Sequence, residues 1–172
     1  TGRDDARPCR AAAADGGSNF LFNVGPKSDG TFPEPYVSCL KKVGKWMRSN
    51  GRAIYGTGKG IADVSTVGYM TVKGSSVFIH ILYWPGNEIC IQGLKNRATA
   101  ARLVADGASV EFWQDREHIY LTGLPEEAPD EYCTVIEIEM DGVPEAYPWA
   151  KGVLWGGDPT LVADWAAKGV ID

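Results

Sequence analysis

The stretch of sequence that decides the fold spans residues 16–57 and reads GGSNFLFNVGPKSDGTFPEPYVSCLKKVGKWMRSNGRAIYGT. It opens on a short apolar run, residues 20–24, in which both faces of an extended chain would be apolar. Strands of this kind are typical of parallel sheets, because helices cover such sheets on both sides. A loop rich in Gly and Pro follows the run, so we expect a buried strand and then a connection.

A helix is predicted directly after this loop, over residues 34–49. Its apolar residues follow one another at intervals of 4, 3 and 4 positions, which places them on one helix face: they are Tyr36, Leu40, Val43 and Met47. Pro35 suits the first turn of a helix, where its missing N–H is no loss. Asn50 and Gly51 supply a C-terminal stop. The stretch therefore predicts one strand, one loop and one helix.

A strand followed by one helix is half of a βαβ repeat, and such a unit cannot bury its own faces. A strand without a parallel neighbour leaves its edges open, at a cost that one helix does not offset. We therefore expect the chain to be the tail of a longer protein, whose missing N-terminal part supplies the neighbouring strands.

The pattern of the chain changes after residue 57. The glycines at 56, 58 and 60 indicate a linker, and short runs separated by turn signals follow without a helix between them. Seven strands at close spacing favour an antiparallel β-sandwich over residues 58–142. The predicted strands are residues 69–73, 76–82, 88–91, 99–103, 110–114, 118–122 and 134–140.

The last segment, residues 143–172, holds one more predicted helix. Asp158 is its N-cap, Pro159 occupies its first position, and Gly169 follows its end. The predicted sandwich does not require this segment, which is left unassigned.

Composition excludes several classes of function. The chain has 172 residues, 44% of them hydrophobic, and a net charge of -5, so it is not a disordered chain. An acidic chain without a basic cluster repels phosphate, which argues against nucleic acid and anionic membranes as partners. No run of 18 apolar residues appears, and a membrane span is therefore not predicted. The sequence does not assign a compartment.

The sequence offers no cofactor or metal site. The four cysteines share no C-x-x-C spacing, and only two histidines accompany them, so zinc is not expected. His80 lies between aliphatic residues of a strand and His118 follows a charged turn, which does not assemble a Ser/His/Asp set. The glycines at 56, 58 and 60 do not match a phosphate-binding fingerprint. Paired acids such as Glu137 and Glu139 alternate on a solvent face and do not flank a sugar as a glycosidase requires.

Trp84 raises an alternative function for the predicted sandwich. It lies in the turn Trp84-Pro85-Gly86, where an exposed aromatic ring could stack on a sugar, or where the ring could instead pack on the sandwich. The first reading makes the sandwich a carbohydrate-binding module, and the second makes it a structural domain. Trp46 and Trp113 are expected in the core.

One residue of the first loop is a candidate for substrate binding. If the strand at residues 20–24 belongs to a β/α barrel, its carboxyl end faces the active site. Asn23 would then stand at the rim with Gly25, Pro26 and Lys27. The Asn23 amide could hydrogen-bond a polar substrate or satisfy backbone groups of the barrel, and the sequence leaves both readings open.

Residues 16–57 closely resemble a segment of the α-L-fucosidases of glycoside hydrolase family 29. The family has a similar G-N-x-L-x-N-V-G-P-x-x-D-G strand and loop, and a helix that ends in W-(M/L)-x-x-N-G-x-(A/S)-I-Y-G-T, here residues 46–57. Residues 68–142 resemble its C-terminal β-sandwich more loosely, best at VFIHILYWPGNEICIQGL, residues 77–94.

The resemblance implies an α+β fragment: the last βα unit of a (β/α)8 barrel in residues 1–57, then an antiparallel β-sandwich in residues 58–142. It implies a hydrolase, a retaining exo-glycosidase that releases terminal α-L-fucose from an oligosaccharide or a glycoprotein glycan. The family's nucleophile and acid/base lie on earlier parts of the barrel, so no catalytic residue is carried over and the fragment itself is expected to be inactive. For the whole enzyme the resemblance favours a secreted or periplasmic site.

Overall fold

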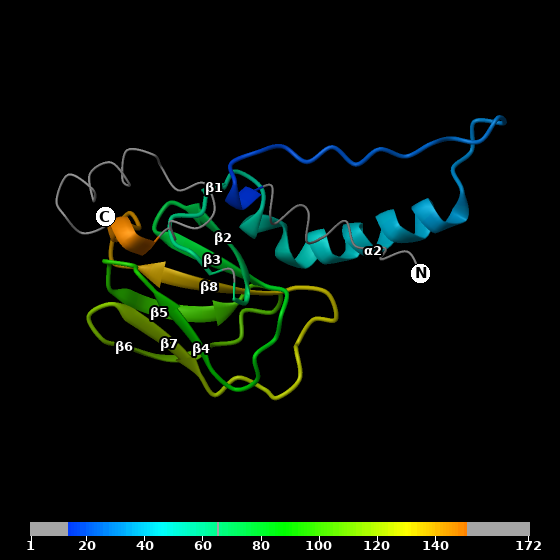
Figure 1. The fold of residues 1–172 in the computed structure, drawn as a ribbon. Helices are drawn as coiled ribbons and strands as arrows, with labels where there is room; N and C mark the ends of the chain where they lie inside the picture. Colours follow the sequence, from blue (N-terminus) through cyan, green and yellow to red (C-terminus); the bar gives the residue numbers. More distant parts are fainter. Residues whose placement is uncertain (1–13, 65, 151–172) are drawn as a thin grey trace, which may run out of the picture.

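The structure is a computed structural model that describes residues 14–64 and 66–150. Three layers follow one another in it: helix α2 (Glu34–Asn50), a five-stranded sheet and a three-stranded sheet (Figure 1). Every strand pair is antiparallel. The described part is thus a small, β-rich α+β domain.

The strands fall into two sheets by a simple order. The five-stranded sheet runs β1-β2-β3-β8-β5 and the three-stranded sheet β4-β7-β6. The bounds are β1 (Gly58–Lys59), β2 (Gly68–Lys73), β3 (Ser76–Ile81), β4 (Ile89–Gln92), β5 (Ala98–Leu103), β6 (Glu111–Gln114), β7 (His118–Thr122) and β8 (Thr134–Met140). All seven predicted strands are confirmed, with ends that differ by at most one residue.

One strand was not predicted. β1 lies in the segment expected to be a free linker, where Gly58 faces Val72 and Lys59 faces Thr71 of β2. The prediction of a linker is wrong at these two residues, because a short glycine-rich segment can pair with the open edge of β2 without any apolar pattern.

A single core lies between the two sheets. Alternate residues of each strand enter it, as the period of two requires. Val77, Ile79 and Ile81 of β3 point inward and meet the inward residues of the smaller sheet. The other members that carry this contact are Ile89, Ile91, Ile119, Leu121, Ile136 and Ile138.

The opposite face of the larger sheet is covered by the C-terminal end of α2. Trp46 packs there with Phe78 and Val135, and its indole Nε1 donates to the carbonyl of Cys133 at 2.8 Å. Ala53, in the 3-10 turn η1 (Gly51–Ala53) that follows α2, is buried in the same cluster. This cluster, which we call the junction, joins the helix to the sheets.

Helix α2 is one residue longer than predicted, and its predicted face is buried only in part: Val43 is buried and Met47 half-buried, as expected. Its buried residues are Cys39, Val43, Trp46 and Asn50. Tyr36 and Leu40, expected on the buried face, are 41% and 39% exposed. The reason is that only the last turns of α2 reach the sheet, while its first turns project away from it (Figure 1).

The expected strand at residues 20–24 does not form in the described residues. The segment is extended and runs alongside α2, but no described strand pairs with it (Figure 1). Phe20 and Phe22 rest on Cys39 and Val43, whereas Leu21 on the other face is 89% exposed. The prediction of a strand is wrong here because an isolated extended segment has no ladder to join.

The start of the unassigned tail packs on the sheets. A β-bridge joins Ala146 to Leu94, and Tyr147 rests against the core between the sheets. A 3-10 turn, η2 (Pro148–Ala150), follows and buries Ala150. The predicted helix at Asp158 to Gly169 lies outside the described residues.

Candidate functional site

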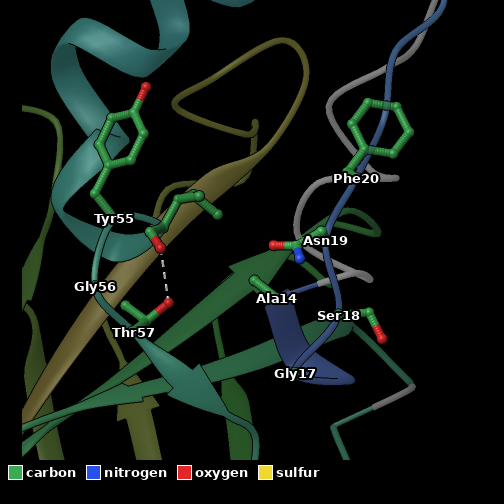
Figure 2. Close-up of a pocket in the computed structure, with 9 residues that line it drawn as sticks. Ala14, Gly17, Ser18, Asn19, Phe20, Tyr55, Gly56 and Thr57 are labelled. Atoms are coloured by element: carbon green, nitrogen blue, oxygen red, sulfur yellow. Dashed lines mark hydrogen bonds between the residues drawn. The ribbon is translucent and has the colours of Figure 1, made fainter.

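The extended segment and helix α2 together form an arm, residues 18–50. A hollow of about 450 Å³ opens where this arm meets the sheets (Figure 2). Two separate segments form its walls, one before the extended segment and one after η1. The lining residues are Ala14, Gly17, Ser18, Asn19, Phe20, Ile54, Tyr55, Gly56 and Thr57.

Short hydrogen bonds hold both walls of the hollow. On one wall the Gly17 N–H donates to the carbonyl of Ala14 at 3.0 Å. Asp15 ties this wall to the larger sheet, since its carbonyl accepts from the Gly60 N–H at 3.0 Å and its side chain from the Met70 N–H at 3.2 Å. On the other wall the Thr57 hydroxyl donates to the carbonyl of Ile54 at 2.8 Å (Figure 2).

The chemistry of the hollow is limited to neutral hydrogen bonding. Ser18 and Asn19 offer a hydroxyl and an amide, and Tyr55 carries a phenol on the rim. No carboxylate or imidazole is among the lining residues. These residues can hold a hydroxyl-bearing ligand, but they cannot exchange a proton with it at neutral pH.

Asn23, the sequence-predicted binding residue, does not line this hollow. It lies exposed on the extended segment, as do Gly25 and Lys27. The loop beyond it is ordered by its own contacts: the Asp29 carboxylate accepts from the Thr31 hydroxyl at 2.7 Å, which lowers the pKa of that carboxyl. The role of Asn23 therefore stays a prediction.

The two histidines have separate surroundings. His80 is fully buried beneath the junction, with its Nε2 3.0 Å from the Thr71 hydroxyl. His118 is half-buried, with its Nδ1 3.1 Å from the Asp115 carboxylate. In the described part of the chain, the ring of His80 hydrogen-bonds to Thr71 and that of His118 to Asp115, and these contacts do not assemble a Ser/His/Asp set.

The three tryptophans considered in the sequence differ in their outcome. Trp84 is half-buried against the core and donates from Nε1 to the carbonyl of Pro125 at 2.9 Å, so its ring is not a free platform. Trp46 is in the core as expected. Trp113 is 52% exposed, and the prediction that it is buried is wrong. The alternation in β6 places Trp113 opposite to Phe112, and Phe112 is the residue that turns inward.

Glu137 is the buried carboxylate of the described residues, and it is engaged in structure. It lies between Arg52, at 2.8 Å, and Arg102, at 3.0 Å, and accepts from the Ser76 hydroxyl at 2.8 Å. These three contacts and its burial give the Glu137 carboxylate a structural role. The sequence had placed Glu137 on the solvent face, and this expectation is wrong because η1 covers that face through Arg52.

The described ranges contain no cluster of three or more His, Cys, Asp or Glu side chains that could hold a metal ion. Within the same ranges, no helix is both long and apolar enough to cross a bilayer.

The family model named Alpha-L-fucosidase matches residues 11–52, which include the extended segment and α2. Tissue alpha-L-fucosidase of Mus musculus is 31% identical over 129 residues, 72% of this chain, and the human tissue enzyme is 38% identical over 77 residues, 42% of this chain. The chain belongs to the α-L-fucosidase family. Its relatives are glycoside hydrolases, as the sequence indicated.

Solved structures of α-L-fucosidases share the fold. Alpha-L-fucosidase isoenzyme 1 from Paenibacillus thiaminolyticus superposes on 81% of this chain with a TM-score of 0.71 and 33% identity. The α-L-fucosidase from Vibrio sp. strain EJY3 covers the same share with a TM-score of 0.74 and 25% identity. This chain spans 28% of the mouse relative and 36% of the Paenibacillus chain.

The comparisons support the interpretation of this chain as the C-terminal part of an α-L-fucosidase. The signature at residues 46–57 contributes to the junction and forms one wall of the hollow. Trp46 packs on the sheet, Ala53 lies beneath it, and Tyr55 reaches the rim. The motif that carries the resemblance therefore joins α2 to the sheets.

Proposed function

We propose that this chain completes the catalytic β/α barrel of an α-L-fucosidase and braces that barrel through an antiparallel β-sandwich. Residues 1–57 supply the last βα unit, and residues 58–142 form the sandwich. The whole enzyme is a retaining exo-glycosidase that releases terminal α-L-fucose from glycans, and its two catalytic carboxylates lie outside this chain. In the completed barrel, Asn23 stands at the rim of the active-site pocket and hydrogen-bonds the sugar.

The observation that carries the proposal is the unburied apolar surface of the arm, residues 18–50. Leu21 is almost fully exposed, and Phe32, Tyr36 and Leu40 each expose more than a third of their surface. A large exposed apolar surface marks a contact with another protein surface. Barrel strands and helices on either side of the arm would cover these residues, and the extended segment would gain the neighbours it needs to become a strand.

A chimera tests the catalytic part of the proposal. This chain replaces the matching C-terminal segment of the Paenibacillus thiaminolyticus enzyme, and turnover of an aryl α-L-fucoside is measured. We expect fucose-specific release by the chimera and none by the 172-residue chain alone. The Asn23→Ala chimera is expected to raise KM at least about tenfold, the loss of one or two sugar hydrogen bonds.

Two results would contradict the proposal. A chimera that is folded and monomeric but inactive would show that this chain does not complete the barrel. Release of fucose by the isolated chain would show that it carries its own catalytic carboxylates.

Self-association tests the exposed arm directly. We expect the isolated chain to form dimers or larger species at micromolar concentration, because the arm is apolar and uncovered. Sedimentation velocity should show a monomer for the Leu21→Glu/Leu40→Glu variant. Val143→Glu, at another exposed apolar residue, is the matched control and should associate as the unchanged chain does. A monomeric unchanged chain would count against an interface on the arm.

A further inference from the structure

The outer face of the three-stranded sheet carries a second group of side chains with binding chemistry. This face is turned away from α2, on the far side of both sheets (Figure 1). The strand register sets Cys90 beside Tyr120 and Tyr120 beside Trp113, in one row across β4, β7 and β6. The next row holds Gln92 and His118. We call the five residues of these two rows together the outer row: Cys90, Gln92, Trp113, His118 and Tyr120.

Trp113 is held in position by its neighbour. The rings of Trp113 and Tyr120 lie 3.9 Å apart between centroids and within 9° of parallel. One face of the indole is thus covered, yet half of the Trp113 surface remains exposed, so the opposite face and the edge are open to solvent. β6 is the edge strand of its sheet, and the described residues place no further strand beside it there. A rigid aromatic face of this kind binds with little loss of side-chain entropy.

Polar groups lie on the Tyr120 side of the ring pair. His118 lies 5.8 Å from the Tyr120 ring, and the Asp115 carboxylate fixes its imidazole through Nδ1. The Asp115 carboxylate also accepts from the backbone N–H groups of Glu117 and His118, at 2.9 and 2.8 Å. The Nε2 of His118 and the amide of Gln92 remain as groups that can exchange hydrogen bonds with hydroxyls. An apolar plate with a few fixed polar groups is the usual composition of a small-ligand site.

The charge around the outer row selects among ligands that stack. Burial raises the pKa of the Tyr120 hydroxyl, and the negative charges of Asp115 and Glu88 add to this increase. Glu111 and Glu117 add further carboxylates on β6 and the β6–β7 turn, and that turn also carries Arg116. Nucleobases also stack on aromatic rings, but their phosphates are repelled by such a surface. A protein partner would need an apolar surface far larger than one ring pair.

We propose that the outer row, centred on Trp113, is a binding site for an uncharged pyranose unit of a glycan. The apolar C–H face of the sugar lies on the open face of Trp113, which points away from Tyr120 at the β6 edge of the sheet. Sialylated and sulfated sugars are disfavoured by the surrounding carboxylates. The site does not depend on hydrolysis, so it stands or falls separately from the proposed barrel function.

Titration of the 172-residue chain with 2′-fucosyllactose and with 3′-sialyllactose tests the site. Saturation-transfer NMR on the sugar protons reports binding without relying on any tryptophan signal, and ¹⁵N–¹H spectra follow the indole groups. We expect 2′-fucosyllactose to shift the Trp113 indole signal saturably, with a Kd of about 1 mM. We expect 3′-sialyllactose to bind about tenfold more weakly at low salt.

Variants locate the site. Trp113→Ala should reduce affinity for 2′-fucosyllactose by at least about tenfold. Trp113→Phe should keep part of it, because a flat ring remains against Tyr120. Trp149→Ala removes another exposed tryptophan and should bind normally. The proposal is overturned if 2′-fucosyllactose causes no saturable change, if Trp113→Ala binds as the unchanged chain does, or if 3′-sialyllactose binds equally well. None of these results bears on the fucosidase chimera.

Discussion

Lowering the pH from 7 to 4 is expected to remove about 3 kcal/mol from the free energy of unfolding through His80 alone. Burial lowers the pKa of His80 from 6.5 to about 4, an effect that the nearby carbonyl of Ala53 only partly opposes. Because the folded-state pKa lies below the unfolded one, the contribution is fully present above pH 6.5. It is lost as the pH falls towards 4, because His80 is protonated in the unfolded chain while it stays largely neutral in the folded chain.

The hydrogen bonds around His80 explain why its ring stays neutral in the folded chain. The Thr71 hydroxyl donates to the carbonyl of Ala53 at 2.8 Å, so it accepts from Nε2–H of His80. The neutral ring is therefore satisfied at Nε2, and its Nδ1 is a buried acceptor with no partner in the described structure. A proton on Nδ1 would place a buried charge and a donor without an acceptor beneath the junction, which is costly.

Urea unfolding of the His80→Gln variant isolates this contribution. The glutamine amide can donate to Thr71 as Nε2 does, but it does not titrate. We expect the unchanged chain to lose about 3 kcal/mol more than the variant between pH 7 and pH 4. Other titrating groups are common to both proteins and cancel in the difference. Equal pH dependence of the two proteins would show that His80 is not kept neutral by burial.

The sheets could be predicted from the sequence because their signals are local. Several strands alternate apolar and polar residues, as Ile136, Ile138 and Met140 do against Glu137 and Glu139, and turn signals separate the strands. The partners of the strands lie within residues 58–142, so each local prediction has the contacts it needs. The confirmed strands show that the pattern is sufficient in such a case.

The arm shows where local pattern is not sufficient. Residues 20–24 are apolar on both faces, yet a strand exists only when another strand hydrogen-bonds to it, and the described residues offer none. The same holds for the helix face: Tyr36 and Leu40 have the right spacing, but nothing described covers them. Length and type of an element follow from the sequence, whereas burial depends on what the element packs against.

The surroundings of Trp84 and Trp113 depend on residues outside their own segments. The turn Trp84-Pro85-Gly86 is compatible with an exposed or a packed ring, and the Trp84 ring packs because it reaches the Pro125 carbonyl, 41 residues away. Trp113 belongs to a run whose alternation is ambiguous, because Phe112 and Trp113 are both aromatic. Reading β6 and β7 together would have helped, since Trp113 faces Tyr120 and the inward residue Leu121 faces Phe112.

The Trp46→Ala variant is expected to lose about 3–5 kcal/mol at the junction. Trp46 fills the space between α2 and the larger sheet, and its contacts with Phe78 and Val135 are the main apolar link between them. Trp46→Phe retains a ring, and the loss of the hydrogen bond to the Cys133 carbonyl should cost about 1 kcal/mol in addition to the lost volume. Val143→Ala, at a position that is 75% exposed, is the control and should change stability by less than about 1 kcal/mol.

Hydrogen exchange shows where the loss falls. The core between the sheets contains no residue of α2, so β3 and β8 should keep slow amide exchange in Trp46→Ala. A free helix of 17 residues is marginal in water, so the α2 amides should exchange rapidly once their anchor is gone. If instead the amides of β3 and β8 lose protection together with α2, arm and sheets form one cooperative unit. If the amides of α2 exchange rapidly while those of β3 and β8 stay protected, the junction connects two separately stable units. In the proposed whole enzyme, Trp46→Ala would then weaken the contact between the barrel and the sandwich. It would lower fucosidase activity without changing a substrate-binding group.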